Sequence, residues 1–217
     1  MGAWSAEQIL RRLAHGRLSR ALACALLVAW ATVIGVPAAA ADPVAASFLD
    51  DAELASVFFI NPDRGWAVGD RGVIWHTRDG GRTWRNQPTP FNCRWEAVQF
   101  LDDNNGFVVG SITQPHTHLT RAVLLKTRNG GEQWTEIRTD TLPGLRGVKF
   151  FDAKNGWIWG DTSGLYPTGV FRTQDAGQTW TPISKGVTTG WVAGDFRDPR
   201  SGAVAGQSGE LGLVAGV

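Results

Sequence analysis

An eight-residue segment recurs three times in this 217-residue chain at nearly constant spacing. It reads T-R-D-G-G-R-T-W at 77–84, T-R-N-G-G-E-Q-W at 127–134 and T-Q-D-A-G-Q-T-W at 173–180. The closing tryptophans are 50 and 46 positions apart. A period of this length is typical of arrays in which one supersecondary unit is repeated, so it predicts a repeat fold before any single element is assigned.

A second signature keeps the same phase: a phenylalanine stands six residues before a glycine in four places. The pairs are Phe59 and Gly65, Phe100 and Gly106, Phe150 and Gly156, and Phe196 and Gly202. Alternating apolar residues lead up to the first three phenylalanines, which predicts strands with one buried face. The runs that begin at the first three glycines are apolar on both faces. We therefore expect these runs to be strands buried between neighbouring units.

The recurring segment forms, in this interpretation, the turn between the third and fourth strands of each unit. Asp and Asn side chains bond to nearby backbone N–H groups, and paired glycines allow positive φ. The closing tryptophan buries a large apolar area beneath the turn. We therefore predict a structural role for the residues of this box: Thr77, Asp79, Gly81, Trp84, Thr127, Asn129, Gly131, Trp134, Thr173, Asp175, Gly177 and Trp180.

Four-stranded units of this length predict an all-β fold, a β-propeller of four-stranded blades. The expected blades are about 53–95, 96–145 and 146–190, with an incomplete blade at 191–217 that lacks a fourth box. About three and a half blades are thus present. An open stack of blades exposes strand edges. This favours a fragment of a longer propeller, or else a half-propeller that closes by self-association.

The box is the aspartate-box repeat that also occurs in sialidases. The longer pattern G-W-A-V-G-D-R-G-V-I-W-H-T-R-D-G-G-R-T-W at 65–84 resembles the repeat of the photosystem II stability and assembly factor family. The resemblance covers residues 53 to about 211. It implies a seven-bladed propeller without catalytic activity, in which an arginine-rich face receives a partner protein during assembly of a membrane complex.

The first 41 residues lie outside the repeat and read as a secretory signal peptide. Arginines precede an apolar run at 21–36, and small residues follow up to Ala41. The run is short for a membrane span. We expect cleavage after Ala41, a linker at 42–52, and export to the periplasm, the extracellular space or a thylakoid lumen. No later run is long enough to span a membrane.

Charge and cysteine content exclude some classes of function. The formal net charge is +1, and it stays near zero without the leader, which argues against nucleic acid as the main partner. Cys93 is the only cysteine after the leader, so no internal disulfide is expected. We expect it to be a small buried apolar residue.

Three candidate chemistries were weighed. Sialidase chemistry needs a tyrosine paired with a glutamate and an arginine cluster, but the chain has one tyrosine, Tyr166, and no matching arginine motif. A glycosidase of the xyloglucanase type would need two carboxylates, for which Asp70 and Asp161 are the candidates, although both are also expected to begin turns. His116 and His118 resemble a partial metal site, but a polar loop with two histidines is favoured.

The most suggestive binding residues are basic. His76, Lys126 and Arg172 each precede the threonine of a box, and arginines in nearby turns add to this column. Arginine suits protein recognition because its planar donors are bidentate and its stem is apolar. Long basic side chains also simply solvate a blade exterior. The predicted basic face consists of Arg64, Arg71, His76, Arg94, Arg121, Lys126, Arg146 and Arg172.

The sequence thus predicts an exported, non-enzymatic propeller that binds a protein partner and needs no cofactor and no metal. The alternative is a carbohydrate-active propeller, hydrolytic or sugar-binding. Tryptophans are compatible with sugar stacking, but most of them repeat in phase and so belong to the core. Of the nine tryptophans after Ala41, only Trp95 and Trp191 stand outside the repeated columns.

Overall fold

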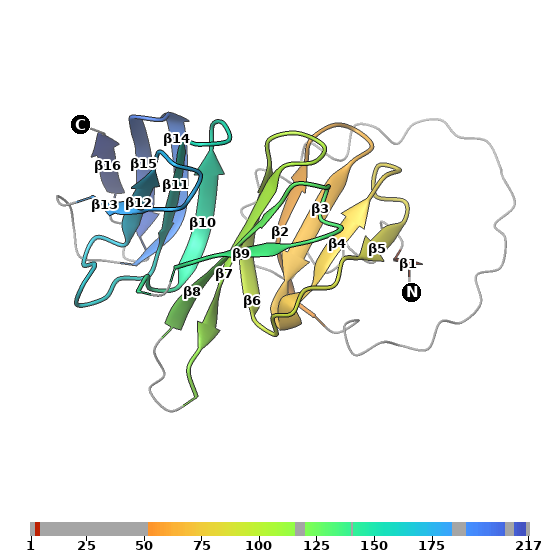
Figure 1. Ribbon diagram of the computed structural model, residues 1–217, viewed down its shortest axis with the longest axis horizontal. Coiled ribbons are helices and arrows are strands. Elements are labelled where there is room, and N and C mark those ends of the chain that lie inside the picture. The colour runs from red at the N-terminus through yellow and green to blue at the C-terminus, as the bar shows by residue number, and fades with distance from the viewer. Residues whose placement is uncertain are drawn as a thin grey trace, which may run out of the picture.

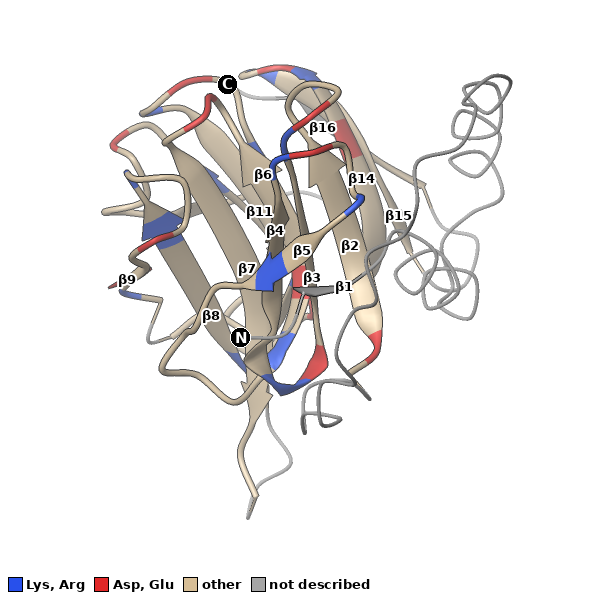
Figure 2. Ribbon diagram, turned by 90° about the vertical axis from the view of Figure 1, so that its right-hand side faces the viewer, with Lys and Arg blue, Asp and Glu red and all other residues tan. Residues whose placement is uncertain are grey.

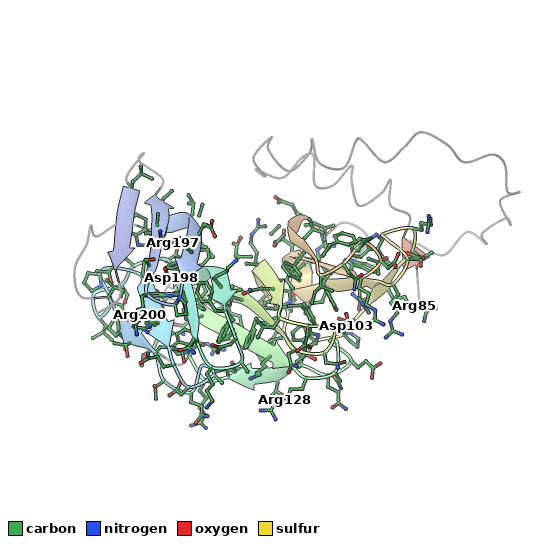
Figure 3. All side chains as sticks on the ribbon, turned by 90° about the horizontal axis from the view of Figure 1, so that it is seen from above. Arg85, Asp103, Arg128, Arg197, Asp198 and Arg200 are labelled. Carbon is green, nitrogen blue, oxygen red and sulfur yellow. The ribbon has the colours of Figure 1, made fainter. Side chains whose placement is uncertain are left out.

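The repeat units fold into four antiparallel β-sheets that follow one another around an open arc (Figure 1). The computed structural model describes residues 3–4, 52–115, 120–139, 141–183, 190–206 and 211–215. The sheets, numbered 1 to 4 in chain order, confirm the predicted all-β partial propeller. From above, the arc has a concave and a convex side (Figure 3).

Antiparallel pairing joins the strands of each sheet in chain order. Sheet 1 contains β2 (Leu54–Phe59), β3 (Gly65–Gly69), β4 (Ile74–Thr77) and β5 (Trp84–Asn86), with β1 (Ala3–Trp4) added at its edge. Sheet 2 contains β6 (Arg94–Phe100), β7 (Gly106–Thr113), β8 (Thr120–Thr127) and β9 (Thr135–Ile137). Sheet 3 contains β10 (Leu145–Phe150), β11 (Gly156–Gly160), β12 (Val170–Thr173) and β13 (Thr181–Pro182). Sheet 4 contains β14 (Trp191–Asp198), β15 (Ser201–Gly206) and β16 (Leu211–Ala215).

The first strand of each sheet is the innermost, because β2, β6, β10 and β14 contact one another in succession. The fourth strands, β5, β9 and β13, lie at the opposite edges of their sheets. The second strands are buried along their length in sheets 1 and 3, as the apolar runs predict. The second strands are therefore the central, buried strands of these sheets.

The phenylalanine–glycine signature has a steric cause. Phe100 pairs with Gly106 across β6 and β7, and the phenylalanine ring lies directly on the glycine. A Cβ at Gly106 would come within 2.5 Å of that ring, and a Cβ at Gly156 within 2.6 Å of the ring of Phe150. Real Cβ atoms do not approach this closely, so only glycine fits beneath each ring.

Stacked aromatic rings join each sheet to the next. Trp66 of β3 stacks on Phe100 with ring centroids 3.4 Å apart, and Phe107 of β7 stacks on Phe150 at 3.7 Å. Trp157 of β11 stacks on Phe196 at 4.9 Å. Burial of rings of this size contributes a large share of the apolar stabilisation of such a fold. The phenylalanine of each phenylalanine–glycine pair thus stacks on a ring that the second strand of the preceding sheet supplies.

Strand boundaries differ slightly from the expected blades. β6 begins at Arg94 and β10 at Leu145, each just before an expected blade boundary, because each residue pairs with the second strand of its own sheet. Within the predicted leader, Ala3 and Trp4 form β1, which pairs with β5. The rest of the leader and residues 42–51 lie outside the described residues.

Candidate functional site

The boxes are built as turn scaffolds. The Thr77 hydroxyl donates to Asp79 Oδ1 at 2.8 Å and accepts from the backbone N–H of Gly81 at 2.9 Å. Asp79 Oδ1 accepts the N–H of Thr83 at 2.8 Å, and the indole of Trp84 donates to the carbonyl of Gly81 at 3.0 Å. Gly81 has φ 86°, a left-handed conformation that favours glycine.

The other two boxes repeat these contacts with small changes. Thr127 and Thr173 bond to the N–H of Gly131 and Gly177 at 2.9 Å. Side-chain and backbone hydrogen bonds from Thr179 hold the pKa of Asp175 below its usual range. A carboxylate held ionised by its own turn is suited to fixing the turn and not to accepting a proton in catalysis.

The eight residues of the predicted basic face do not form a single surface. Strand pairing places Arg64, His76, Lys126 and Arg172 at the end of the sheets that carries the boxes. Arg71, Arg94, Arg121 and Arg146 lie at the opposite end, where the second strands finish. Charged residues gather mainly in the turns and at strand ends in Figure 2.

Carboxylates neutralise several of these arginines. Arg94 contacts Asp70 at 2.7 Å and Glu96 at 2.9 Å, and Arg146 contacts Asp161 at 3.0 Å. Arg121 pairs with Glu136 at 3.4 Å, and Arg64 pairs with Asp103. At the end of the sheets opposite the boxes, Arg94, Arg121 and Arg146 are therefore ion-paired.

The column of His76, Lys126 and Arg172 covers the repeated aromatic rings. His76 stacks on Trp66 with centroids 4.8 Å apart, Lys126 Nζ lies 5.3 Å from the centroid of Phe107, and Arg172 Cζ lies 5.8 Å from that of Trp157. Cations over aromatic faces are stabilising. The recurrence of the column thus has a packing cause, and only the outer ends of its side chains are available for binding.

His76 is the buried member of the column, 9% exposed. Burial, followed by the nearby charges of Arg78 and Arg64, lowers its pKa from 6.5 to about 4. His76 is therefore neutral near pH 7. Burial and the charge of Arg128 likewise lower the pKa of Lys126.

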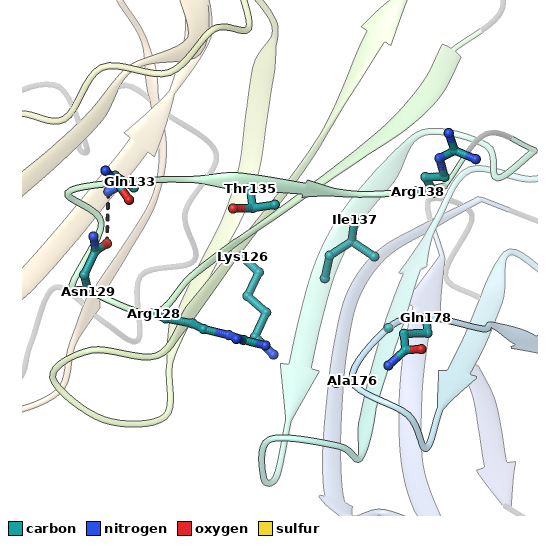
Figure 4. Close-up of a pocket in the computed structure, with 10 residues that line it drawn as sticks. Lys126, Arg128, Asn129, Gln133, Thr135, Ile137, Arg138, Ala176 and Gln178 are labelled. Atoms are coloured by element: carbon teal, nitrogen blue, oxygen red, sulfur yellow. Dashed lines mark hydrogen bonds between the residues drawn. The ribbon is translucent and has the colours of Figure 1, made fainter.

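A groove of about 680 Å³ lies between sheets 2 and 3 at the end that carries the boxes (Figure 4). We call it the 2–3 groove. Its positive residues are Lys126, Arg128 and Arg138, and its walls include Ile137 and Gln178. Lys126 and Arg128 converge in Figure 4, and Arg128 lies on the convex side of the arc in Figure 3. Among the described residues, no Asp or Glu lines the groove and none of its three cations pairs with a carboxylate.

The corresponding place between sheets 1 and 2 is filled and neutral. Gln87, at the position of Ile137, donates to the carbonyl of Gly130 at 2.8 Å and packs against Gly131. Arg78, at the position of Arg128, lies 3.7 Å from Glu132, which takes the position of Gln178. The same repeat therefore builds one closed junction and one cationic groove.

The candidate catalytic residues have structural partners. Asp70 is paired with Arg94, and Asp161 accepts from both Arg146 and Thr120. The hydroxyl of Tyr166 lies 3.2 Å from that of Thr141, and no carboxylate is bonded to it among the described residues. Each of the two candidate carboxylates is thus ion-paired with an arginine.

The remaining candidates are buried or outside the described residues. Trp95 and Trp191 are 0% and 2% exposed, so neither is available for sugar stacking. Cys93 is buried as predicted, and burial raises the pKa of its thiol to about 12. His116 and His118 lie outside the described residues, within which no group of three or more His, Cys, Asp or Glu could hold a metal ion. The described part also contains no helix long and apolar enough to cross a membrane.

Arg128, Arg138 and Gln178 line the groove but are not among the residues of the predicted basic face. The signal was present in the second and sixth positions of the box, which are Arg and Arg, Arg and Glu, and Gln and Gln in the three copies. The charge at a junction can be inferred from these positions only when one knows that the second position of one box faces the sixth position of the next. Without that contact, Arg128 is indistinguishable from an ordinary solvated arginine.

Comparisons with known proteins agree with this fold. The model of a family described as photosynthesis system II assembly factor YCF48 matches residues 45–208. The chloroplastic photosystem II stability/assembly factor HCF136 of Arabidopsis thaliana is 35% identical over 57 residues, which are 25% of this chain and 14% of that protein.

Two solved structures share the architecture. A structure of YCF48 bound to D1 peptide has a TM-score of 0.57 and 23% identity, over 72% of this chain and 47% of that one. The GH74 xyloglucanase of Xanthomonas campestris has a TM-score of 0.52 and 15% identity, over 75% of this chain and 27% of that one. The chain thus spans less than half of each of these proteins, and identities this low show the fold alone.

Proposed function

The chain belongs to the photosynthesis system II assembly factor YCF48 family, and from that premise we propose that it is a non-catalytic propeller scaffold that binds a partner protein during assembly of a membrane complex. One observation carries the proposal. The 2–3 groove holds three cations without a carboxylate partner among the described residues, whereas the arginines at the opposite end are ion-paired. Unpaired positive charge beside an apolar wall suits recognition of an acidic protein surface.

The likeness to a YCF48 structure bound to D1 peptide supports a peptide-bearing partner. The test is titration of the full chain with a synthetic D1 peptide at several salt concentrations. We expect saturable binding that weakens as salt rises, because charges near the surface are screened. Absence of binding to D1 peptide and to other peptides, together with release of reducing sugar from xyloglucan, would replace the scaffold with a glycosidase.

We also propose that the protein acts after export, in the periplasm, the extracellular space or a thylakoid lumen. The basic and apolar segments of residues 1–41 support this. Mass spectrometry of the protein from the exported fraction should find a mature N-terminus at Asp42. Recovery of the uncleaved chain from the cytosolic fraction alone would contradict export.

A further inference from the structure

The outer edge of sheet 2 is open beside the 2–3 groove. β9 is the last strand of its sheet, and no described strand pairs with its outer side. An edge strand of this kind presents backbone N–H and C=O groups that another extended chain can pair with. The groove and the open edge meet at Thr135 and Ile137, which belong to both.

In the unprocessed chain, before the expected removal of residues 1–41, the equivalent edge of sheet 1 is occupied. β1 pairs with β5 in antiparallel register, with Ala3 opposite Arg85 and Trp4 opposite Trp84. These two positions of β5 correspond to Thr135 and Trp134 in the repeat. The fold therefore accepts an extended segment at this edge without changing the order of the other strands.

The register of sheet 2 dictates what such a segment would present to the groove. Lys126 pairs with Thr135 and Leu124 with Ile137, so the four side chains share the face that points towards sheet 3. A residue added opposite Thr135 would point into the groove beside Lys126 and Arg128, and one opposite Ile137 would meet an apolar wall. The residue between them would lie on the other face, opposite Glu136.

We propose that the 2–3 groove and the edge of β9 bind an extended segment of the partner protein as an added antiparallel strand. The segment has the pattern apolar–any–acidic, with the apolar residue opposite Ile137 and the acidic residue opposite Thr135. Main-chain pairing supplies affinity and the alternate side chains supply specificity, as in other cases of strand addition. This inference rests on the proposed function, because it names the chemistry of the partner segment.

The test is binding of a fluorescein-labelled peptide, Gly-Ser-Val-Thr-Glu-Ser-Gly, to the full chain. Replacing its Glu with Gln should weaken binding about fivefold, and the double variant Lys126→Gln, Arg128→Gln about tenfold. Arg78→Gln is the matched control, since Arg78 takes the position of Arg128 in the closed junction. It should leave the dissociation constant within about twofold.

Modified peptides test the strand pairing without altering the protein. Two peptides carry one N-methyl group each, on Thr or on the preceding Val. Because N–H groups of a strand point alternately to its two sides, one of the two should lose binding and the other should keep it. Equal binding of both peptides, or equal competition by inorganic phosphate at the peptide's concentration, would overturn strand addition.

Failure of the inference is distinguishable from failure of the proposed function. If D1 peptide binds and the double variant leaves its affinity unchanged, the scaffold proposal stands and the 2–3 groove is the wrong site. If neither D1 peptide nor the labelled peptide binds the folded chain, the proposed function itself is wrong. Thermal unfolding of each variant confirms that the fold is retained.

Discussion

The junction between sheets 1 and 2 and the junction between sheets 2 and 3 are built from the same repeat but differ in charge and in filling. In the first, Gln87 closes the gap on the next box and Arg78 faces Glu132. In the second, Ile137 packs against Gly177 but cannot hydrogen-bond to the box, and Arg128 and Gln178 line the 2–3 groove. The aromatic stack beneath is preserved in both, with Trp66 on Phe100 and Phe107 on Phe150.

The comparison indicates that the buried residues of the repeat determine the fold, whereas the residues at the rim of each sheet determine the charge of the junction. The rings and glycines are fixed by packing, since each phenylalanine covers a glycine that tolerates no Cβ. The rim residues carry no such constraint and vary between copies. The proposed binding site lies where the rim loses its acidic partner, at Gln178.

The largest expected effect comes from removing a stacked ring. Trp66→Ala should lower the free energy of unfolding by about 5 kcal/mol and Phe107→Ala by about 3 kcal/mol. The indole of Trp66 also donates to the carbonyl of Gly130, a hydrogen bond that the ring of Phe107 cannot form. Urea denaturation measures both values, and a larger loss at Phe107 would contradict the stronger coupling of the closed junction.

The next effect is a pH dependence confined to the closed junction. The pKa of His76 is about 4 in the fold, against 6.5 when unfolded. The unfolded chain binds the proton first, so this stability is fully present above pH 6.5 and is lost as pH falls towards 4, by about 3 kcal/mol.

His76→Phe is the matched variant for this pH dependence, because it keeps a ring on Trp66. It should abolish the slope of unfolding free energy between pH 6.5 and 5, where the carboxylates remain ionised. Lys126 at the same position in sheet 2 does not titrate in this range. If the His76→Phe variant kept the same slope of unfolding free energy against pH, a group other than His76 would cause the pH dependence.

The smallest expected effect comes from a substitution that gives the junction between sheets 2 and 3 the charge of the junction between sheets 1 and 2. Gln178→Glu places a carboxylate near Arg128 and should weaken the labelled peptide about fivefold while changing stability by no more than about 0.5 kcal/mol. The reverse change at the other junction, Glu132→Gln, should leave peptide affinity within about twofold, because Gln87 still closes that gap. Fluorescence anisotropy distinguishes the two, and equal effects would show that the junctions do not differ in binding.

Much of the fold was predictable because the residues that recur in the sequence are the ones that pack against one another. The phenylalanine–glycine pairs, the second strands and the box turns lie where the sequence places them, and Thr77 and Asp79 hydrogen-bond within the first box turn. The cationic groove was not predictable, because it depends on which rim residues of neighbouring sheets meet. The recurrence of a basic residue before each box predicts Lys126 as a candidate. Arg128 differs from Arg78 in the residue at the sixth position of the next box, which is Gln178 for Arg128 and Glu132 for Arg78.

The central claim is that the 2–3 groove and the edge of β9 bind an extended peptide. Its most direct test is hydrogen–deuterium exchange of the full chain with and without the peptide Gly-Ser-Val-Thr-Glu-Ser-Gly. Binding at the 2–3 groove should slow exchange in β9, at Thr135–Ile137, and leave the corresponding strand β5, at Trp84–Asn86, unchanged. Slowed exchange only at the opposite end of the sheets, around Arg94 and Arg146, would contradict the account.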